Sequence, residues 1–150
     1  MIDTSVVLAF YLPAEPYKSQ ALTLLADYTA SAVKLVTPTL TYYEVLNVLS
    51  RAVRGLKKEQ KISRDEAAAI LSALVHLKLE ERSIQGLEDR ILEITERYQR
   101  SGYDAAYLAL AEHLGADLTT GDERFYNAVK GDFSLVQFIA DYVSTSSSNP

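Results

Sequence analysis

Two hydrophobic patterns alternate along this chain, short β-branched runs and longer stretches with apolar residues at helical spacing. Residues 33–37 form a β-branched run closed by Pro38, which is typical of a buried strand. Residues 117–120 are brief and strand-like, and residues 135–139 form a last apolar run. The pattern therefore predicts short strands that are well separated in the sequence.

Capping signals predict where two of the helices between these runs begin. Thr41 and Glu44 have the spacing of a capping box and precede a series of apolar positions, so we expect a helix from Thr41 to near Gly55. Ser63 and Glu66 repeat this signal ahead of a single apolar stripe at positions 67, 70, 71 and 74. Both stretches are predicted to be amphipathic helices.

The second half of the chain predicts three more helices. Residues 87–98 are amphipathic, and Asp104 opens an Ala-rich run over residues 105–114 that ends at Gly115. After a turn at 121–122, residues 123–129 form a short helical stretch. Strands separated by helical crossovers indicate a parallel sheet with helices on both faces, an α/β fold. Such sheets bind ligands outside the carboxyl ends of their strands.

Length and composition narrow the classes of protein that fit this fold. The 150 residues suit one domain, which we place at residues 1–143, and residues 144–150 resemble a disordered tail. The chain has no Cys, which excludes disulfide frameworks, thiolate zinc sites and cysteine nucleophiles. No run approaches the roughly 18 apolar residues of a membrane span, and no signal peptide is visible. We expect a cytoplasmic protein with no membrane partner.

Three acidic residues, Asp3, Glu44 and Asp122, follow a strand or open a helix at the edge where such a sheet places its chemistry, and a fourth, Asp104, can reach that edge if its helix starts there. Each acid alone is explained more simply by helix capping or by the helix dipole. Carboxylates gathered within about 4 Å of one another would repel by about 4 kcal/mol per pair at an effective dielectric constant near 20. A hard divalent cation with oxygen ligands removes that repulsion. Carboxylate-bound Mg²⁺ or Mn²⁺ supports phosphoryl transfer, so phosphodiester hydrolysis is the natural reaction class.

Four segments together resemble the PIN-domain ribonucleases, and among them the VapC-like toxins of bacterial and archaeal toxin–antitoxin pairs. They are residues 3–8, 43–47, 103–112 and 118–125, and they occur in the family's order. The resemblance implies a three-layer α/β/α fold with a central, mainly parallel sheet. It also implies a metal-dependent endoribonuclease that acts on RNA, is neutralised by a small antitoxin and forms a homodimer. A stand-alone PIN nuclease and a catalytically idle binding domain remain alternatives.

Position by position, the resemblance assigns roles to seven residues. Asp3, Glu44, Asp104 and Asp122 correspond to the acidic quartet that binds Mg²⁺ or Mn²⁺ and activates water. Ser5 and Thr120 correspond to hydroxyls that orient these carboxylates, and Asn47 to a polar residue one turn after the Glu. Capping, strand-end hydrogen bonding and a surface helix position are the simpler explanations of these three supporting residues.

The chain departs from the family at its start. Family members have several apolar residues that form a first strand before the first Asp, whereas only Met1 and Ile2 precede Asp3 here. A central strand of that length would unsettle both the position of Asp3 and the sheet. We therefore expect that native residues upstream of Met1 are missing from this numbering.

A basic run and several tyrosines are the remaining candidates for RNA contact. The run comprises Arg51, Arg54, Lys57, Lys58, Lys61 and Arg64. A solvated helix face is the commoner meaning of such a run, and phosphate contact is the alternative. Tyr42, Tyr43, Tyr103 and Tyr107 lie near the acids in sequence and could stack on bases. We favour rings half within the core with hydroxyls that reach water.

Overall fold

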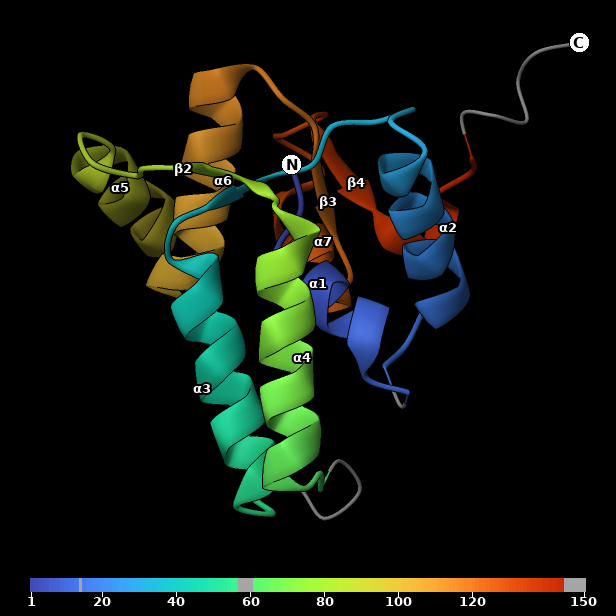
Figure 1. Cartoon of the computed structure of the whole chain (residues 1–150). Helices are drawn as coiled ribbons and strands as arrows, with labels where there is room; N and C mark the ends of the chain where they lie inside the picture. The colour runs from blue at the N-terminus through green and yellow to red at the C-terminus, as the bar shows by residue number, and fades with distance from the viewer. Residues whose placement is uncertain (14, 57–60, 145–150) are drawn as a thin grey trace, which may run out of the picture.

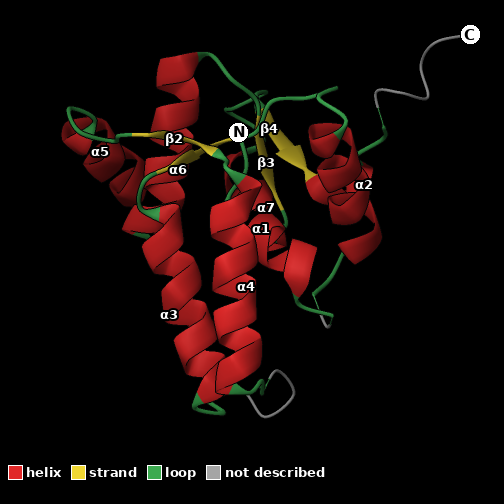
Figure 2. Ribbon diagram, in the orientation of Figure 1, coloured by secondary structure: helices red, strands yellow, loops and turns green. Residues whose placement is uncertain are grey.

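Helices enclose a short parallel sheet on both sides (Figures 1 and 2). The computed structural model describes residues 1–13, 15–56 and 61–144. In chain order its elements are α1 (Thr4–Tyr11), α2 (Lys18–Thr29), β1 (Val36–Pro38), α3 (Thr41–Val53), α4 (Arg64–Leu77), β2 (Glu80–Arg82), α5 (Glu88–Tyr98), α6 (Gly102–Leu114), β3 (Leu118–Thr120), α7 (Glu123–Val129), β4 (Val136–Phe138) and the 3-10 turn η2 (Ile139–Asp141).

The first three residues occupy the middle of the sheet. Strand β1 pairs with β2 and β3 pairs with β4, both in parallel. Ile2 joins these pairs, because its N–H donates to the carbonyl of Val36 at 3.0 Å and it forms a parallel bridge with Thr119. Thr119 N–H donates in turn to the Met1 carbonyl at 2.8 Å. The spatial order is therefore β2, β1, residues 1–3, β3, β4, with the central position held by a very short segment.

Two hydrophobic clusters, one on each face of the sheet, produce the three layers. One cluster gathers α1, α2, α3 and α4 together with Ile2 and Leu35. The other gathers α5, α6 and α7 together with Met1 and Leu118. Met1 and Ile2 belong to opposite clusters, as the two-residue period of an extended segment requires. The α/β/α arrangement with a parallel sheet is thus confirmed.

Most predicted elements appear with shifted ends. The strand expected at 33–37 is β1 at Val36–Pro38, and the run at 135–139 contains β4. The helix assigned to begin at Asp104 begins at Gly102, because the Ser101 side chain caps it by accepting from Asp104 N–H at 3.1 Å. The capping box at Ser63 and Glu66 is present as predicted.

The predicted capping box at Thr41 and Glu44 is wrong. The residue before α3 is Leu40, and no side chain caps the helix there. The Thr41 hydroxyl is instead buried against the hydroxyls of Thr37 and Tyr107. The Glu44 carboxylate accepts hydrogen bonds from other elements rather than from its own helix end. Tertiary contacts thus displace the local motif at this helix start.

Strand β2 was not predicted, because it lacks a hydrophobic pattern. Its residues Glu80, Glu81 and Arg82 are all exposed, and it lies at the edge of the sheet. Charged side chains on an edge strand oppose pairing with another chain. At the other end of the sequence, Ser144 donates to the buried carboxylate of Asp27 at 2.8 Å, whereas residues 145–150 of the expected tail lie outside the described residues. Within the described ranges, no helix is both long and apolar enough to cross a membrane.

Candidate active site

Asp3 lies at the carboxyl end of the central segment and caps α1. Its side chain is 8% exposed, and its Oδ1 accepts from Val6 N–H at 3.2 Å and from the Ser5 hydroxyl at 2.5 Å. Its Oδ2 accepts from the Thr120 hydroxyl at 2.5 Å. Burial raises the pKa of Asp3 to about 6, and the nearby Glu44 charge adds to this, while the hydrogen bonds oppose it.

Ser5 and Thr120 connect Asp3 to the turn that carries Asp122. Gly121 N–H donates to the Ser5 hydroxyl at 2.7 Å, and Asp122 N–H donates to the Thr120 hydroxyl at 3.0 Å. A Cβ at Gly121 would approach the Ser5 hydroxyl to 3.1 Å, so glycine permits this close contact. Asp122 caps α7 by accepting from Phe125 N–H at 2.9 Å. Each hydroxyl therefore bridges one carboxylate to the backbone of a distant segment.

Glu44 projects from the first turn of α3 and is held from two other helices. Its Oε2 accepts from the Thr4 hydroxyl of α1 at 2.6 Å and from the Tyr107 hydroxyl of α6 at 3.0 Å. Burial raises the pKa of Glu44, and the charge of Asp104 raises it further. The carboxylate thus lies between helices from opposite faces of the sheet.

Asp104 occupies the first turn of α6. It lies beside the basic side chain of Arg100, which is not part of any motif identified in the sequence. Arg100 Nε lies 3.6 Å from Asp104 Oδ2, an i,i+4 pair that spacing alone could have indicated. This Nε is buried and makes no hydrogen bond with the described part of the chain. Burial raises the pKa of Asp104, Ser101 and Arg100 oppose that rise, and Asp122 adds to it.

All four predicted acids line one pocket, together with Thr4, Ser5, Leu8, Val48 and Tyr107. We call it the acid pocket; its volume is about 170 Å³. The acids come from the central segment, α3, α6 and the turn after β3, which are four separate segments of the chain. Each raised pKa includes a contribution from another acid of the set, so their charges act on one another. Their catalytic role stays a prediction.

The donor atoms of the pocket and their positions show how well it suits a metal ion. Carboxylate and hydroxyl oxygens are the donors that Mg²⁺ and Mn²⁺ prefer, so the chemistry of the pocket fits a hard divalent cation. Among the residues that the structure describes, however, no three His, Cys, Asp or Glu side chains are grouped closely enough to hold an ion. Asp3, Glu44 and Asp122 have carboxylate oxygens bound to hydroxyl or N–H donors of the protein instead.

The other predicted residues lie apart from this pocket. Asn47 is exposed and does not line it, whereas Val48, one position further along α3, does. Arg51, Arg54 and Lys61 are exposed near the far ends of α3 and α4. Lys57 and Lys58 lie outside the described residues. At about 1.5 Å per residue, Arg54 is about 15 Å along α3 from Glu44.

Tyr42 is half-buried against the core as expected, but the other three tyrosines differ from that state. Tyr43 and Tyr103 are 73% and 53% exposed, more than that expectation allows. Tyr107 is only 2% exposed, and its hydroxyl contacts Thr4, Thr41 and Glu44 rather than water. Base stacking is therefore impossible for Tyr107 in this conformation. Thr4 and Tyr107 are the pocket residues whose role the sequence did not reveal.

Comparison with known proteins identifies the family to which this pocket belongs. The model of the PIN domain family matches residues 1–131, a span that includes all four acids. The chain belongs to the PIN-domain family. This PIN domain is also similar to Ribonuclease VapC3 of Pyrobaculum aerophilum, with 33% identity over 128 residues that cover 83% of the chain and 89% of that protein. The resemblance drawn from the sequence is thereby confirmed, down to its VapC-like branch.

Proposed function

We propose that this PIN domain is a metal-dependent endoribonuclease whose reaction takes place in the acid pocket. The observation that carries the proposal is the meeting of Asp3, Glu44, Asp104 and Asp122, from four separate segments, in one pocket at the carboxyl ends of the strands. Separate caps need no common meeting point, and mutual repulsion opposes one. The match to the PIN family and the similarity to a ribonuclease supply the reaction class.

The four acids are the residues that would hold the cation. A bound Mg²⁺ or Mn²⁺ supplies positive charge for phosphoryl transfer and makes water more acidic. Ser5 and Thr120 fix both oxygens of Asp3, so this carboxylate has one orientation before substrate arrives. Glu44 keeps both of its hydroxyl donors on Oε2, and the raised pKa values of Glu44 and Asp104 reflect the cost of carrying charge in a buried place.

The similarity to a VapC ribonuclease also supports a proposal about the biological role. We propose that this protein is the toxin of a VapBC-like toxin–antitoxin pair, that it acts in the cytoplasm, and that a small antitoxin shields the acid pocket. The similarity to Ribonuclease VapC3 supports this assignment. A homodimer is part of the same expectation. The net charge of −5 means that RNA must be held locally, by the pocket's cation and by basic side chains, rather than by overall charge.

An RNA-cleavage assay with Asp104→Asn tests the proposal. The purified protein should cleave RNA with Mg²⁺ or Mn²⁺ and stop when EDTA is added. Asp104→Asn should lower kcat by about 100-fold or more, a typical loss for a group acting directly in the reaction. The matched control is Asp89→Asn, because Asp89 is an exposed acid in the first turn of α5 and serves that helix dipole without lining the pocket.

The outcomes separate the competing interpretations. Cleavage lost in Asp104→Asn but kept in Asp89→Asn supports the proposed reaction. Cleavage that survives both EDTA and Asp104→Asn contradicts the mechanism. A parent protein that binds Mn²⁺ but cleaves no RNA indicates the catalytically idle domain instead.

A further inference from the structure

Four hydroxyls form a buried chain behind Glu44. They belong to Thr4 in α1, Thr37 in β1, Thr41 in α3 and Tyr107 in α6, and each side chain is no more than 5% exposed. Buried polar groups persist in proteins when they are hydrogen-bonded to one another, and such chains fix a specific arrangement. The assigned roles of the acid pocket do not account for this chain, which extends well beyond it.

Counting protons gives the chain a direction. Thr4 donates its single hydroxyl proton to Glu44 Oε2 at 2.6 Å, and the Tyr107 proton is shared between two acceptors, Glu44 Oε2 at 3.0 Å and the Thr4 oxygen at 2.7 Å. With its own proton committed, the Tyr107 oxygen must accept from Thr41, which lies 2.8 Å away. Thr41 has then used its proton and must accept from Thr37, its other contact. The chain therefore runs from Thr37 through Thr41 and Tyr107 to Glu44.

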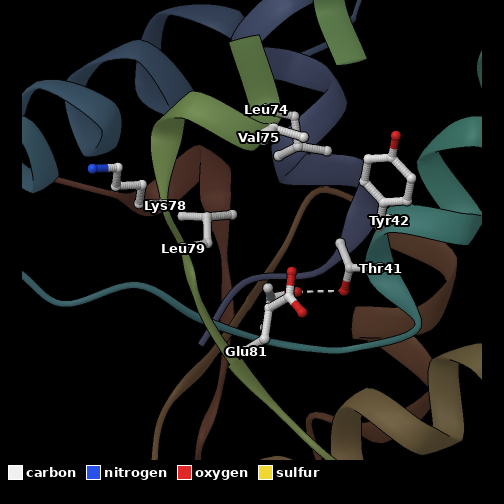
Figure 3. A pocket seen from close by; sticks show the side chains of 8 residues that line it. Thr41, Tyr42, Leu74, Val75, Lys78, Leu79 and Glu81 are labelled. Carbon is white, nitrogen blue, oxygen red and sulfur yellow. Dashed lines mark hydrogen bonds between the residues drawn. The ribbon is translucent and has the colours of Figure 1, made fainter. Parts of the chain in front are cut away.

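The far end of this chain reaches a second, smaller pocket of about 130 Å³. Thr37 and Thr41 line it, together with residues of α4 and the following segment such as Leu74, Lys78 and Leu79. Figure 3 shows Thr41 beside this pocket, and its hydroxyl is hydrogen-bonded to that of Thr37. The two ends of the chain are thus in different pockets. Thr37 and Thr41 can therefore be substituted while every residue that lines the acid pocket is kept.

The chain also links Glu44 to α6, the helix that carries Asp104. Tyr107 follows Asp104 by three residues on α6, so both side chains lie on the same side of that helix. Glu44 belongs to α3 on the opposite face of the sheet, and its side chain has several freely rotating bonds. Two donors that meet on Oε2 restrict those rotations and leave the other oxygen, Oε1, outside this chain.

We propose that Tyr107, oriented by the Thr41 hydroxyl, is a positioning residue that holds the Glu44 carboxylate in register with Asp104 for binding of a divalent cation. This inference rests on the proposed function, because it concerns the same pocket. Tyr107 acts through Glu44 and touches neither the cation nor the RNA. Outer partners that orient metal ligands typically contribute 10- to 100-fold, about one to two orders of magnitude, in affinity or activity.

The direct test is Tyr107→Phe, which removes one oxygen and keeps the ring in the core. Binding of Mn²⁺ alone, followed by electron paramagnetic resonance, should weaken by about 10-fold or more. The kcat for RNA cleavage should fall comparably while the KM for RNA stays the same. The matched control is Tyr142→Phe, because the Tyr142 hydroxyl also donates to a buried carboxylate, that of Asp27, which is not among the acid-pocket residues.

A second pair of variants covers the case in which Tyr107→Phe does not fold. Thr41→Val removes the donor to Tyr107 and should weaken Mn²⁺ binding in the same direction, whereas Thr41→Ser keeps the hydroxyl and should recover most of that loss. A purely structural role would make binding follow thermal stability in both variants. Parent-like Mn²⁺ affinity in Tyr107→Phe, or in Thr41→Val, overturns the positioning role.

These outcomes can be told apart from failure of the proposed function. If the parent binds Mn²⁺ and cleaves RNA but the variants match it, only the positioning role fails. If the parent neither binds Mn²⁺ nor cleaves RNA, the proposed function fails, and the positioning role falls with it.

Discussion

The acid pocket and the tip of the α3–α4 hairpin carry opposite charges and are built in opposite ways. By the tip we mean residues 51–56 and 61–64, where α3 ends and α4 begins. In the pocket, acids from four segments are partly or fully buried and held by hydroxyls and N–H groups. At the tip, basic residues from one stretch of chain are exposed, and the helices that carry them extend away from the sheet (Figure 1).

This difference determines how each region can contribute to function. Buried charges interact strongly because little water screens them, so the pocket can bind a small ion and is less stable while no ion is present. Exposed charges are screened by salt and contribute little to folding, so the tip can change without harm to the fold. This contrast has measurable consequences, and the largest concerns the free energy of unfolding.

The stability of the metal-free protein should fall as the pH rises from about 4 to about 6. In that window an unfolded Asp3 loses its proton near its ordinary pKa, while the folded one keeps it up to its pKa of about 6. The folded state then binds more protons, so the free energy of unfolding decreases by about 3 kcal/mol. Urea unfolding in EDTA at a series of pH values measures this change.

The variant Asp3→Asn isolates the contribution of this one carboxyl group. It should flatten the pH dependence, because the carboxyl group that titrates in this window is gone. Added Mn²⁺ should stabilise the parent increasingly as the pH rises, since a cation competes with protons for the same oxygens. An unchanged pH dependence in Asp3→Asn would show that Asp3 is not the group that titrates.

The bridge between Asp3 and Asp122 predicts a smaller loss. Thr120→Val keeps the shape of a fully buried side chain but removes the donor to Asp3 and the acceptor of Asp122 N–H. Leaving these groups without partners should lower the free energy of unfolding by about 2 kcal/mol. Thr119→Val, on the neighbouring and less buried position of β3, should change it by no more than about 0.5 kcal/mol.

The capping box at the start of α4 is a local feature of the tip, and its loss can be compared with the loss in Thr120→Val. Ser63→Ala removes one half of the capping box of α4, and a loss of about 1 kcal/mol is expected, as for other N-cap residues. If Ser63→Ala cost more than Thr120→Val, the pocket would not be the more tightly coupled of the two regions. Denaturant midpoints of the three variants, measured in one buffer, decide this.

The same contrast explains what the sequence could reveal. Ser63 and Glu66 are neighbours along the helix, so their box was visible in spacing alone. The box at Thr41 and Glu44 has equal spacing, yet Tyr107 and Thr4, which are distant in sequence, bind Glu44 instead. Position after a strand was enough to nominate Asp3, Glu44 and Asp122, whereas Asp104, which follows α5, was nominated by its place at a helix start and by the family resemblance. The hydroxyl chain behind them was not foreseeable, because its contacts exist only after the sheet brings α1, α3 and α6 together.

Removal of the basic side chains at the tip should affect stability least and salt dependence most. The triple variant Arg51→Ser, Arg54→Ser and Lys61→Ser changes exposed residues only, so its unfolding free energy should stay within about 0.5 kcal/mol of the parent. If these residues bind phosphates, the slope of RNA affinity against salt should decrease by about 0.7 for each phosphate that the variant no longer neutralises. Binding is measured in an Asp104→Asn background, so that cleavage does not interfere. An unchanged slope would show that the basic residues of the tip do not bind phosphates and are only a solvated surface. RNA must then be recognised nearer the acid pocket, where the exposed rings of Tyr43 and Tyr103 are next to Glu44 and Asp104 in the sequence.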